Sequence, residues 1–231
     1  MSTILVTSSA GAQGAAIAQA FVRAGHRVRG LSRHTLPATP GIDVVVGDLA
    51  TGQGLDAAMD GVETVVFTSP LDYRAGVREA MARHVAEIAA RQGVRRVVFN
   101  SAGPIFDDVD RPVSAVLRQI RSIVHAGPVP AVTVQPTVYM DNLLAPWAWS
   151  AITGAGVLPY PMVPGDPVAW LSHRTLAESV VAAATRSGIE GAVFDLGGPE
   201  TVTPTDVARR LSRLLGRDVT YQQVPLDAFA E

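Results

Sequence analysis

The sequence contains neither cysteine nor lysine, and each absence excludes a class of chemistry. Without cysteine the chain has no disulfide, no cysteine-ligated zinc and no thiol nucleophile. All nineteen basic residues are arginine, so a Schiff base and a lysine general base are excluded as well. No metal site is predicted, and the absence of cysteine favours a cytoplasmic location.

Long apolar runs and a strong excess of charge of one sign are also missing. No uninterrupted apolar stretch approaches the ~18 residues that a membrane span needs, and no export signal is recognisable. The net charge is −2 and the arginines are interspersed with acidic residues, so no basic face for nucleic acid is expected. We therefore predict a small-molecule substrate as the partner, with no binding to nucleic acid or membrane.

Short β-branched runs alternate with stretches of helical period, which is the pattern of βαβ units around a parallel sheet. The predicted strands are residues 4–6, 28–31, 44–46, 64–67, 97–100, 132–135 and 193–196. The predicted helical stripes are Ile17, Phe21 and Ala24; Val77, Met81, Val85 and Ile88; and Val116, Ile120 and Ile123. The pattern predicts an α/β fold with a Rossmann-type doubly wound parallel sheet.

The length of 231 residues and the hydrophobic content of 48% are sufficient for one large core, so we predict a single domain over 1–231. Its core is expected at about 1–142. Residues 143–190 and 197–231 are expected to form a small C-terminal, loop-rich substrate-binding region. Within it, residues 144–167 are rich in proline, glycine and aromatic residues without a sustained period, which predicts a functional loop.

A strand, a Gly-rich turn and the start of a helix follow one another over residues 4–14. Backbone N–H groups at a helix N-terminus attract a diphosphate, and Gly11 and Gly14 stand where the backbone must approach it. Ser8 occupies the first position of the motif, where glycine is usual, so a tight turn without a ligand is the alternative. The predicted nucleotide-binding residues of this segment are Thr7, Ser8, Gly11, Ala12, Gln13 and Gly14.

The end of the second predicted strand indicates which nucleotide binds. NAD-binding proteins usually place an acidic residue there against the ribose hydroxyls. This sequence has no acid at that point and has Ser32 and Arg33 instead, which suit a 2′-phosphate. NADP is therefore predicted in preference to NAD.

Segments along almost the whole chain resemble the NmrA-like branch of the atypical short-chain dehydrogenase/reductases. In order and spacing, they are residues 4–14, 25–28, 32–33, 47–49, 58–62, 93–99, 101–103, 135–136, 139–142 and 197–200. The resemblance implies that Asp48 and Leu49 lie by the adenine, that Thr68, Ser69 and Pro70 follow the cofactor, and that Pro136 to Tyr139 border the nicotinamide. Asp48 as a turn cap and Pro136 as a strand end are the simpler alternatives.

Reductases of the wider superfamily use a tyrosine proton donor with a lysine four residues later, and neither is found around residues 112–116. Ser101 aligns with the serine of the family's triad and is a further cofactor-site candidate. Hydride transfer needs only an oriented nicotinamide, so redox chemistry is not excluded. The catalytic candidates are Ser101, Tyr139 and His173, with Asp141 as another proton donor. The alternatives are a helix cap for His173 and a stacking or core role for Tyr139.

Aromatic residues gather in the loop-rich region, and a cleft lined by them suits a flat, apolar substrate. The predicted substrate-binding residues are Asn142, Trp147, Tyr160 and Trp170. Core packing or contacts within a homodimer are the alternatives.

Three functions follow from these observations. The first is an NADP(H)-dependent reductase of a small apolar carbonyl, quinone or enone. The second, which the missing Tyr-Lys pair and Ser8 suggest, is a non-redox isomerase, cyclase or dehydratase on the same scaffold. The third is a regulatory protein that senses NADP without turnover.

Overall fold

A computed structural model describes residues 1–108 and 112–225, and these residues fall into two compact units. The first unit comprises Met1–Pro136 and His173–Leu196, and the second comprises Thr137–Ser172 and Gly197–Glu231. A compact unit is not by itself an independently folding domain, so the single domain stays a prediction. In the part of the chain that is described, no helix is both long and apolar enough to cross a membrane.

The first unit is built on a parallel sheet of seven strands in the order β3-β2-β1-β4-β5-β6-β8. The strands are β1 (Thr3–Val6), β2 (Arg27–Ser32), β3 (Ile42–Val46), β4 (Thr64–Thr68), β5 (Arg96–Asn100), β6 (Ala131–Pro136) and β8 (Val193–Leu196). Every predicted strand is therefore confirmed, with ends that differ by at most two residues. The order reverses between β1 and β4, and such a switch point in an open α/β sheet opens a crevice at the carboxyl ends of the strands.

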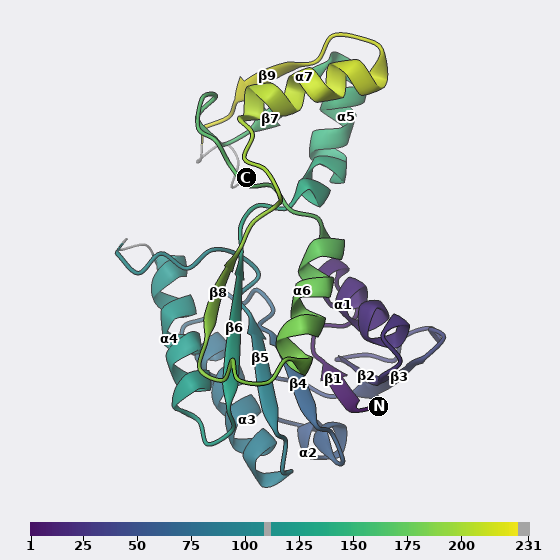
Figure 1. The fold of residues 1–231 in the computed structure, drawn as a ribbon, viewed down its shortest axis with the longest axis vertical. Coiled ribbons are helices and arrows are strands. Elements are labelled where there is room, and N and C mark those ends of the chain that lie inside the picture. Colours follow the sequence, from purple (N-terminus) through teal and green to yellow (C-terminus); the bar gives the residue numbers. More distant parts are fainter. Residues whose placement is uncertain (109–111, 226–231) are drawn as a thin grey trace. The chain divides into compact units, whose positions relative to one another are not determined.

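Helices cover both faces of this sheet (Figure 1). Helices α1 (Ala12–Arg23) and α6 (His173–Thr185) pack against each other on one face. Helices α2 (Leu55–Met59), α3 (Val77–Arg91) and α4 (Pro112–Ala126) lie on the other, where α3 packs against both of its neighbours. The predicted doubly wound architecture is confirmed.

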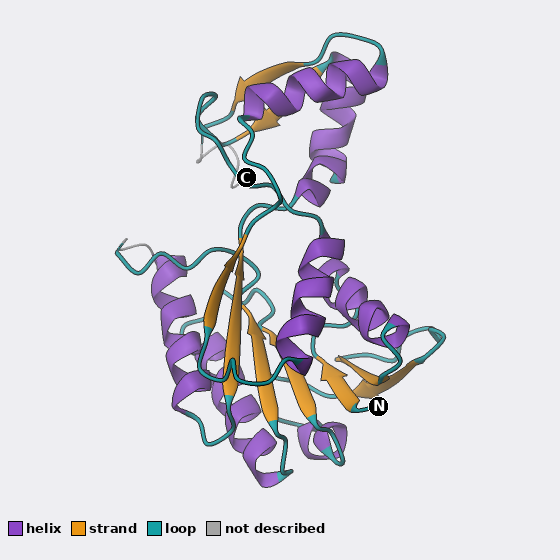
Figure 2. Ribbon diagram, viewed as in Figure 1, coloured by secondary structure: helices purple, strands orange, loops and turns teal. Residues whose placement is uncertain are grey.

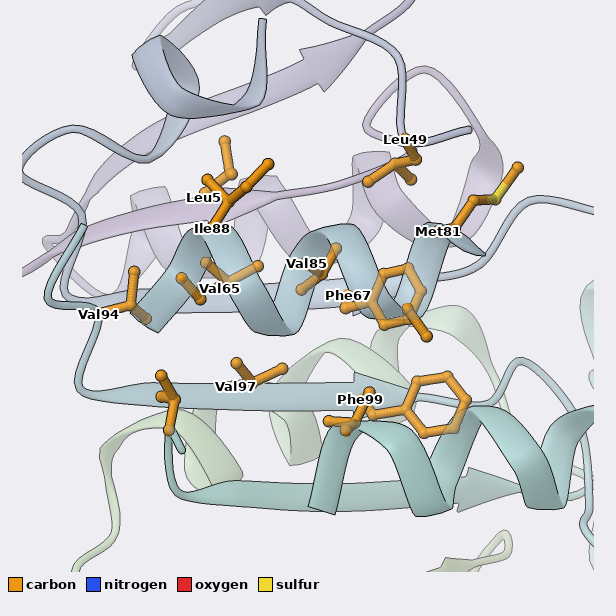
Figure 3. Close-up of a cluster of buried hydrophobic side chains, with 14 of the residues drawn as sticks. Leu5, Leu49, Val65, Phe67, Met81, Val85, Ile88, Val94, Val97 and Phe99 are labelled. Atoms are coloured by element: carbon orange, nitrogen blue, oxygen red, sulfur yellow. The ribbon is translucent and has the colours of Figure 1, made fainter. Parts of the chain in front are cut away.

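The core on the α3 and α4 side is formed by the predicted apolar stripes (Figure 3). Phe67 and Phe99, on adjacent strands, stack with ring centroids 5.6 Å apart, and Met81 and Val85 of α3 belong to the same cluster. On α1, Ile17 and Phe21 are fully buried. Ala24 was expected to continue that stripe, but it is exposed because it caps the C-terminal end of the helix.

The second unit contains a 3₁₀ helix η1 (Met140–Leu144), helices α5 (Pro146–Ala155) and α7 (Pro204–Leu215), and a parallel pair of strands. These strands are β7 (Val157–Tyr160) and β9 (Thr220–Gln223). The loop predicted for residues 144–167 is therefore wrong, because α5 and β7 occupy most of it. Helix α5 begins with Pro146 at its first position and buries Ala148 and Ile152, one turn apart.

The predicted boundary of the substrate region also needs a correction. Residues 143–190 were assigned to it, but α6 and the segment leading to β8 belong to the first unit. Helix α6 is amphipathic, and its apolar residues Leu176, Ala177 and Val180 are completely buried. They pack in the layer with α1 and against β4, β5 and β6.

Candidate functional site

The Gly-rich turn between β1 and α1 lies at the carboxyl edge of the parallel sheet, the edge marked by the arrowheads in Figure 2. Ser8, which stands at the first motif position, has a left-handed backbone with φ of 53°. Its hydroxyl donates to the carbonyl of Thr68 over 3.0 Å, and the Thr7 hydroxyl donates to the same carbonyl over 3.1 Å. The turn keeps the conformation that glycine usually provides because it is tied to the end of β4.

Gly14 is required by a close approach within the same turn. A Cβ built on Gly14 would lie 2.2 Å from the backbone oxygen of Ser8 and 2.7 Å from its carbonyl carbon. A Cβ on Gly11 would lie 3.4 Å from that oxygen, which is an ordinary contact. The two glycines therefore differ in role: Gly14 lets the helix pack on the turn, and Gly11 leaves the helix N-terminus open.

The N-terminus of α1 offers donors for an anion. Gly11 is its N-cap, no side chain caps the helix, and its first turn holds no acidic residue. The first N–H groups of a helix lack partners within the helix, and the helix dipole favours negative charge there. The donor set and the close approach at Gly14 thus fit the pyrophosphate of a dinucleotide.

Asn100 holds the ends of three elements together beneath the turn. It is fully buried at the end of β5, and its Nδ2 donates to Gln13 Oε1 over 2.9 Å and to Thr68 Oγ1 over 3.2 Å. Its Oδ1 accepts from the backbone N–H of Ala102. Asn100 was not among the predicted site residues, although a polar residue at the end of an apolar strand is a signal that marks it.

A cavity of about 330 Å³ lies beside the turn at the same edge of the sheet. It lies entirely in the first unit and is lined by segments from the turn, the ends of β2 and β3, and the loop after β4. Predicted cofactor residues on its wall are Ser8, Gly11, Ser32, Arg33, Asp48, Leu49 and Pro70. The wall also contains residues that were not predicted as site residues, among them His34, Leu36, Leu71, Asp72, Arg74 and Met81.

Other predicted cofactor residues lie away from this wall. Thr7, Thr68 and Ser69 are buried, and Gln13 is partly buried. Pro136 is the last residue of β6, which agrees with the alternative that this proline ends a strand. Asp48 likewise caps its own turn, since its Oδ1 accepts from the backbone N–H of Ala50 over 2.8 Å.

Two ion-pairing residues of the cavity come from the loop after β4. Asp72 Oδ1 accepts from the backbone N–H and the Nε of Arg74, each over 3.0 Å, and Oδ2 accepts from Nη2 over 2.6 Å. These hydrogen bonds from Arg74 lower the pKa of Asp72 to about 2, and the charge of Arg33 contributes to the shift. Arg33 itself is exposed and forms no ion pair among residues 1–108 and 112–225.

Behind this loop, Arg78 of α3 is buried, and its Nε donates to the hydroxyl of Ser69 over 3.1 Å. Burial lowers the pKa of the Arg78 guanidinium, because the charged form is less well solvated there. Arg78 therefore orients Ser69, one of the predicted cofactor residues, from the side of the core.

The predicted catalytic residues differ in their surroundings. Ser101 is buried, and its hydroxyl contacts the backbone carbonyls of Gly103 at 2.5 Å and Val134 at 3.3 Å. Tyr139, in the second unit, is buried, and desolvation followed by the charge of Asp141 raises the pKa of its phenol. His173 is partly buried and is the first residue of α6 in the first unit.

The predicted substrate-binding residues cluster in the second unit. The rings of Trp147 and Trp170 contact that of Tyr160, with centroids 5.8 Å and 5.2 Å apart, and Asn142 Nδ2 donates to the Tyr160 hydroxyl over 2.9 Å. Tyr160 and Trp170 are buried in the core of this unit, whereas 43% of Trp147 is exposed. The structure thus brings the four residues together, with Tyr160 and Trp170 packed as core residues.

The sheet order, the open helix N-terminus at the Gly-rich turn and the adjoining cavity define a dinucleotide-binding protein of the Rossmann type. The sequence pattern of the NmrA-like family matches residues 1–231, and the chain belongs to that family. The resemblance seen in the sequence is confirmed.

The chain is 34% identical to the (4-alkanoyl-5-oxo-2,5-dihydrofuran-3-yl)methyl phosphate reductase of Streptomyces griseus subsp. griseus, over 97% of this chain and 78% of that one. It is 29% identical to the NAD(P)H azoreductase of Xenophilus azovorans, over 81% of this chain and 63% of that one. Its fold is similar to that of the Citrobacter sp. triphenylmethane reductase complexed with NADP(H), with a TM-score of 0.83 and 21% identity over 98% of this chain and 80% of that one. These three proteins are all reductases, and the names of two of them include NAD(P)H or NADP(H).

Proposed function

We propose that this protein uses NADPH to reduce the conjugated C=C bond of a small enone. The enone is one of the three substrate classes that the sequence suggests, and the relative with 34% identity favours it. The name of that relative's substrate describes an unsaturated lactone ring whose double bond is conjugated to two carbonyl groups. The observation that carries the proposal is the cavity beside the Gly-rich turn, because a cavity at this place would hold a cofactor in a chain of this family.

Different residues at the cavity would bind different parts of the cofactor. The open N-terminus of α1 at Gly11 would hold the pyrophosphate, and Arg33 at the end of β2 would pair with the 2′-phosphate. Asp48 and Leu49 line the cavity and would border the adenine, although Asp48 also caps its own turn. When bound, NADPH supplies the hydride for reduction.

His173 is the proton donor that the fold supports best. A helix that follows one parallel strand and leads into the next begins at the carboxyl edge of the sheet, so the start of α6 lies at the edge of the Gly-rich turn. Histidine is suited to proton transfer near neutral pH. Ser101 already contacts two backbone carbonyls, and the raised pKa of Tyr139 makes its phenol a weaker acid.

The aromatic group of the second unit would contact the substrate through its accessible member. Trp147 is 43% exposed, whereas Tyr160 and Trp170 are buried. An indole face suits a flat conjugated ring, since aromatic groups stack on one another in offset arrangements. Tyr160 and Trp170 would then support Trp147 and would not touch the substrate themselves.

The assignment of Arg33 is tested by titrating the purified protein with NADPH and with NADH in a calorimeter. We expect tighter binding of NADPH, because only NADPH offers a phosphate to the guanidinium, and we expect Arg33→Ala to remove most of this preference. Arg23→Ala is a matched control, since Arg23 lies at the opposite end of α1. Equal affinity of the wild type for both nucleotides would contradict the assignment.

The substrate class is tested with a panel that contains an acyl butenolide, a quinone and a saturated ketone, each with NADPH. We expect NADPH consumption to be fastest with the butenolide. His173→Gln should lower its turnover about a hundredfold without changing NADPH affinity. Conversion of a substrate at constant NADPH absorbance would favour a non-redox enzyme, and binding without turnover of any compound would favour a sensor.

A further inference from the structure

Two arginines from separate parts of the chain line the cofactor cavity, and only one of them was expected there. Arg33 follows β2, and Arg74 lies in the loop between β4 and α3. Because the chain has no lysine, these two guanidinium groups are the permanent cations on the cavity wall. The loop that carries Arg74 shows no motif, so its place at the cavity follows only from the fold.

Arg74 and Arg33 differ in what they contact. Arg74 presents its planar fork to Asp72 through Nε and Nη2, in the two-pronged arrangement by which arginine also binds phosphate. Arg33 has no such carboxylate among the residues that the structure describes. Among the described residues, the Arg33 guanidinium on the cavity wall therefore forms no ion pair, whereas the Arg74 guanidinium is paired with the carboxylate of Asp72.

Asp72 is anchored independently of the Arg74 side chain. Its Oδ1 also accepts from the backbone N–H of Arg74, and its side chain is only 16% exposed. The Arg74 side chain is 75% exposed, so water screens the ion pair and makes it weak. The guanidinium can thus leave Asp72 at little cost, while Asp72 stays on its own turn.

We propose that Arg74 is a second ligand for the 2′-phosphate of NADP, and that Asp72 competes with this phosphate for the Arg74 guanidinium. The inference rests on the proposed role of this cavity as the cofactor site. A phosphate monoester carries nearly two negative charges at neutral pH, so it attracts the guanidinium more strongly than one carboxylate does. Asp72 stays ionised throughout this range, because its pKa is held at about 2. Asp72 thereby lowers the affinity of the protein for NADP.

The test uses two small probes that differ by one phosphate, adenosine 2′,5′-bisphosphate and adenosine 5′-monophosphate. Their affinities are measured by calorimetry, with no turnover involved. We expect Arg74→Gln to weaken binding of the bisphosphate about tenfold and Asp72→Asn to strengthen it about threefold. Binding of the monophosphate should change in neither variant.

Two further variants separate competition from a structural role of the loop. In the double variant Asp72→Asn/Arg74→Gln, most of the gain from Asp72→Asn should vanish, because the guanidinium that is hydrogen-bonded to Asp72 is absent. Arg91→Gln is the matched control, since Arg91 forms an exposed ion pair with Asp56 and does not line the cavity. It should leave both affinities unchanged.

Failure of this inference and failure of the proposed cofactor site give different results. If the wild type prefers the bisphosphate and Arg33→Ala removes the preference but Arg74→Gln does not, only the role of Arg74 is overturned. If Asp72→Asn weakens bisphosphate binding, the competition is overturned. If the wild type binds both probes equally, the 2′-phosphate site itself is wrong.

Discussion

Replacement of Gly14 by alanine tests the geometry of the Gly-rich turn between β1 and α1. Gly14 lies in the first turn of α1, and its added Cβ would meet the Ser8 oxygen at 2.2 Å and Ser9 Cα at 3.0 Å. Because these are backbone atoms, no rotation of a side chain relieves the clash. The turn would have to move away from the helix, and Ser8 would lose its hydrogen bond to Thr68.

The size of the effect follows from two opposing contributions. Overpacking a well-packed site costs about 1–3 kcal/mol, and contact with backbone at 2.2 Å places this site at the upper end. Glycine to alanine inside a helix otherwise stabilises by about 1 kcal/mol. We therefore expect Gly14→Ala to lower the free energy of unfolding by about 2 kcal/mol.

The assay is urea unfolding followed by circular dichroism, with NADPH affinity measured by calorimetry on the same samples. Gly11→Ala is the matched control, because its Cβ would lie 3.4 Å from the Ser8 oxygen and its backbone, with φ of −82°, suits alanine. It should cost under about 1 kcal/mol of stability as an N-cap substitution. A Gly14→Ala protein as stable as the wild type would refute the reasoning.

Two further predictions concern a buried and a partly buried polar residue of the first unit, Asn100 and His125. Asn100→Ala should lower the free energy of unfolding by about 2–3 kcal/mol in urea titrations and weaken NADPH binding, because it removes a fully buried amide that donates to the buried Thr68 hydroxyl and accepts from the Ala102 N–H; a loss under about 1 kcal/mol would speak against it. Burial, and then the charge of Arg121, lower the pKa of His125 below its usual 6.5, so the folded state takes up its proton less readily than the unfolded state. The contribution of neutral His125 to the free energy of unfolding should thus be complete above about pH 6.5. It should decrease as the pH falls from 6.5 toward the lower pKa that His125 has in the folded state. In His125→Gln the free energy of unfolding should decrease less steeply over this range. Equal slopes for the two proteins, measured by urea unfolding at several pH values, would contradict this.

The strands of the first unit were predictable because each is a short β-branched run between turn residues. Their order and the covering of both faces then follow from the alternation of strands and helices. Helix α5 and strand β7 were not predictable in this way. The buried residues of α5 span a single turn, which is too short to show a period, and β7 contains Pro159, which argues against a strand in a sequence.

The place of the Gly-rich turn and of Arg33 at the cavity was predictable, because both follow strands in a local order of strand, turn and helix. Asp72 and Arg74 were not, because their loop has no sequence pattern and reaches the cavity only through the pairing of β4 with β1. The left-handed Ser8 shows the opposite case. Ser8 is not the residue that the motif usually has, yet it adopts the left-handed backbone that glycine usually provides there. The hydrogen bond from its hydroxyl to the Thr68 carbonyl at the end of β4 holds it in this conformation.

Transfer of deuterium from labelled NADPH tests the central claim most directly. The protein is incubated with an acyl butenolide and NADPH that carries deuterium at the transferable position of its nicotinamide, and the product is examined by NMR and mass spectrometry. Reduction of the conjugated bond predicts one deuterium on the carbon β to the carbonyl, with one NADPH consumed per product. A product without deuterium, or with deuterium on the carbonyl carbon, would contradict the proposed reaction.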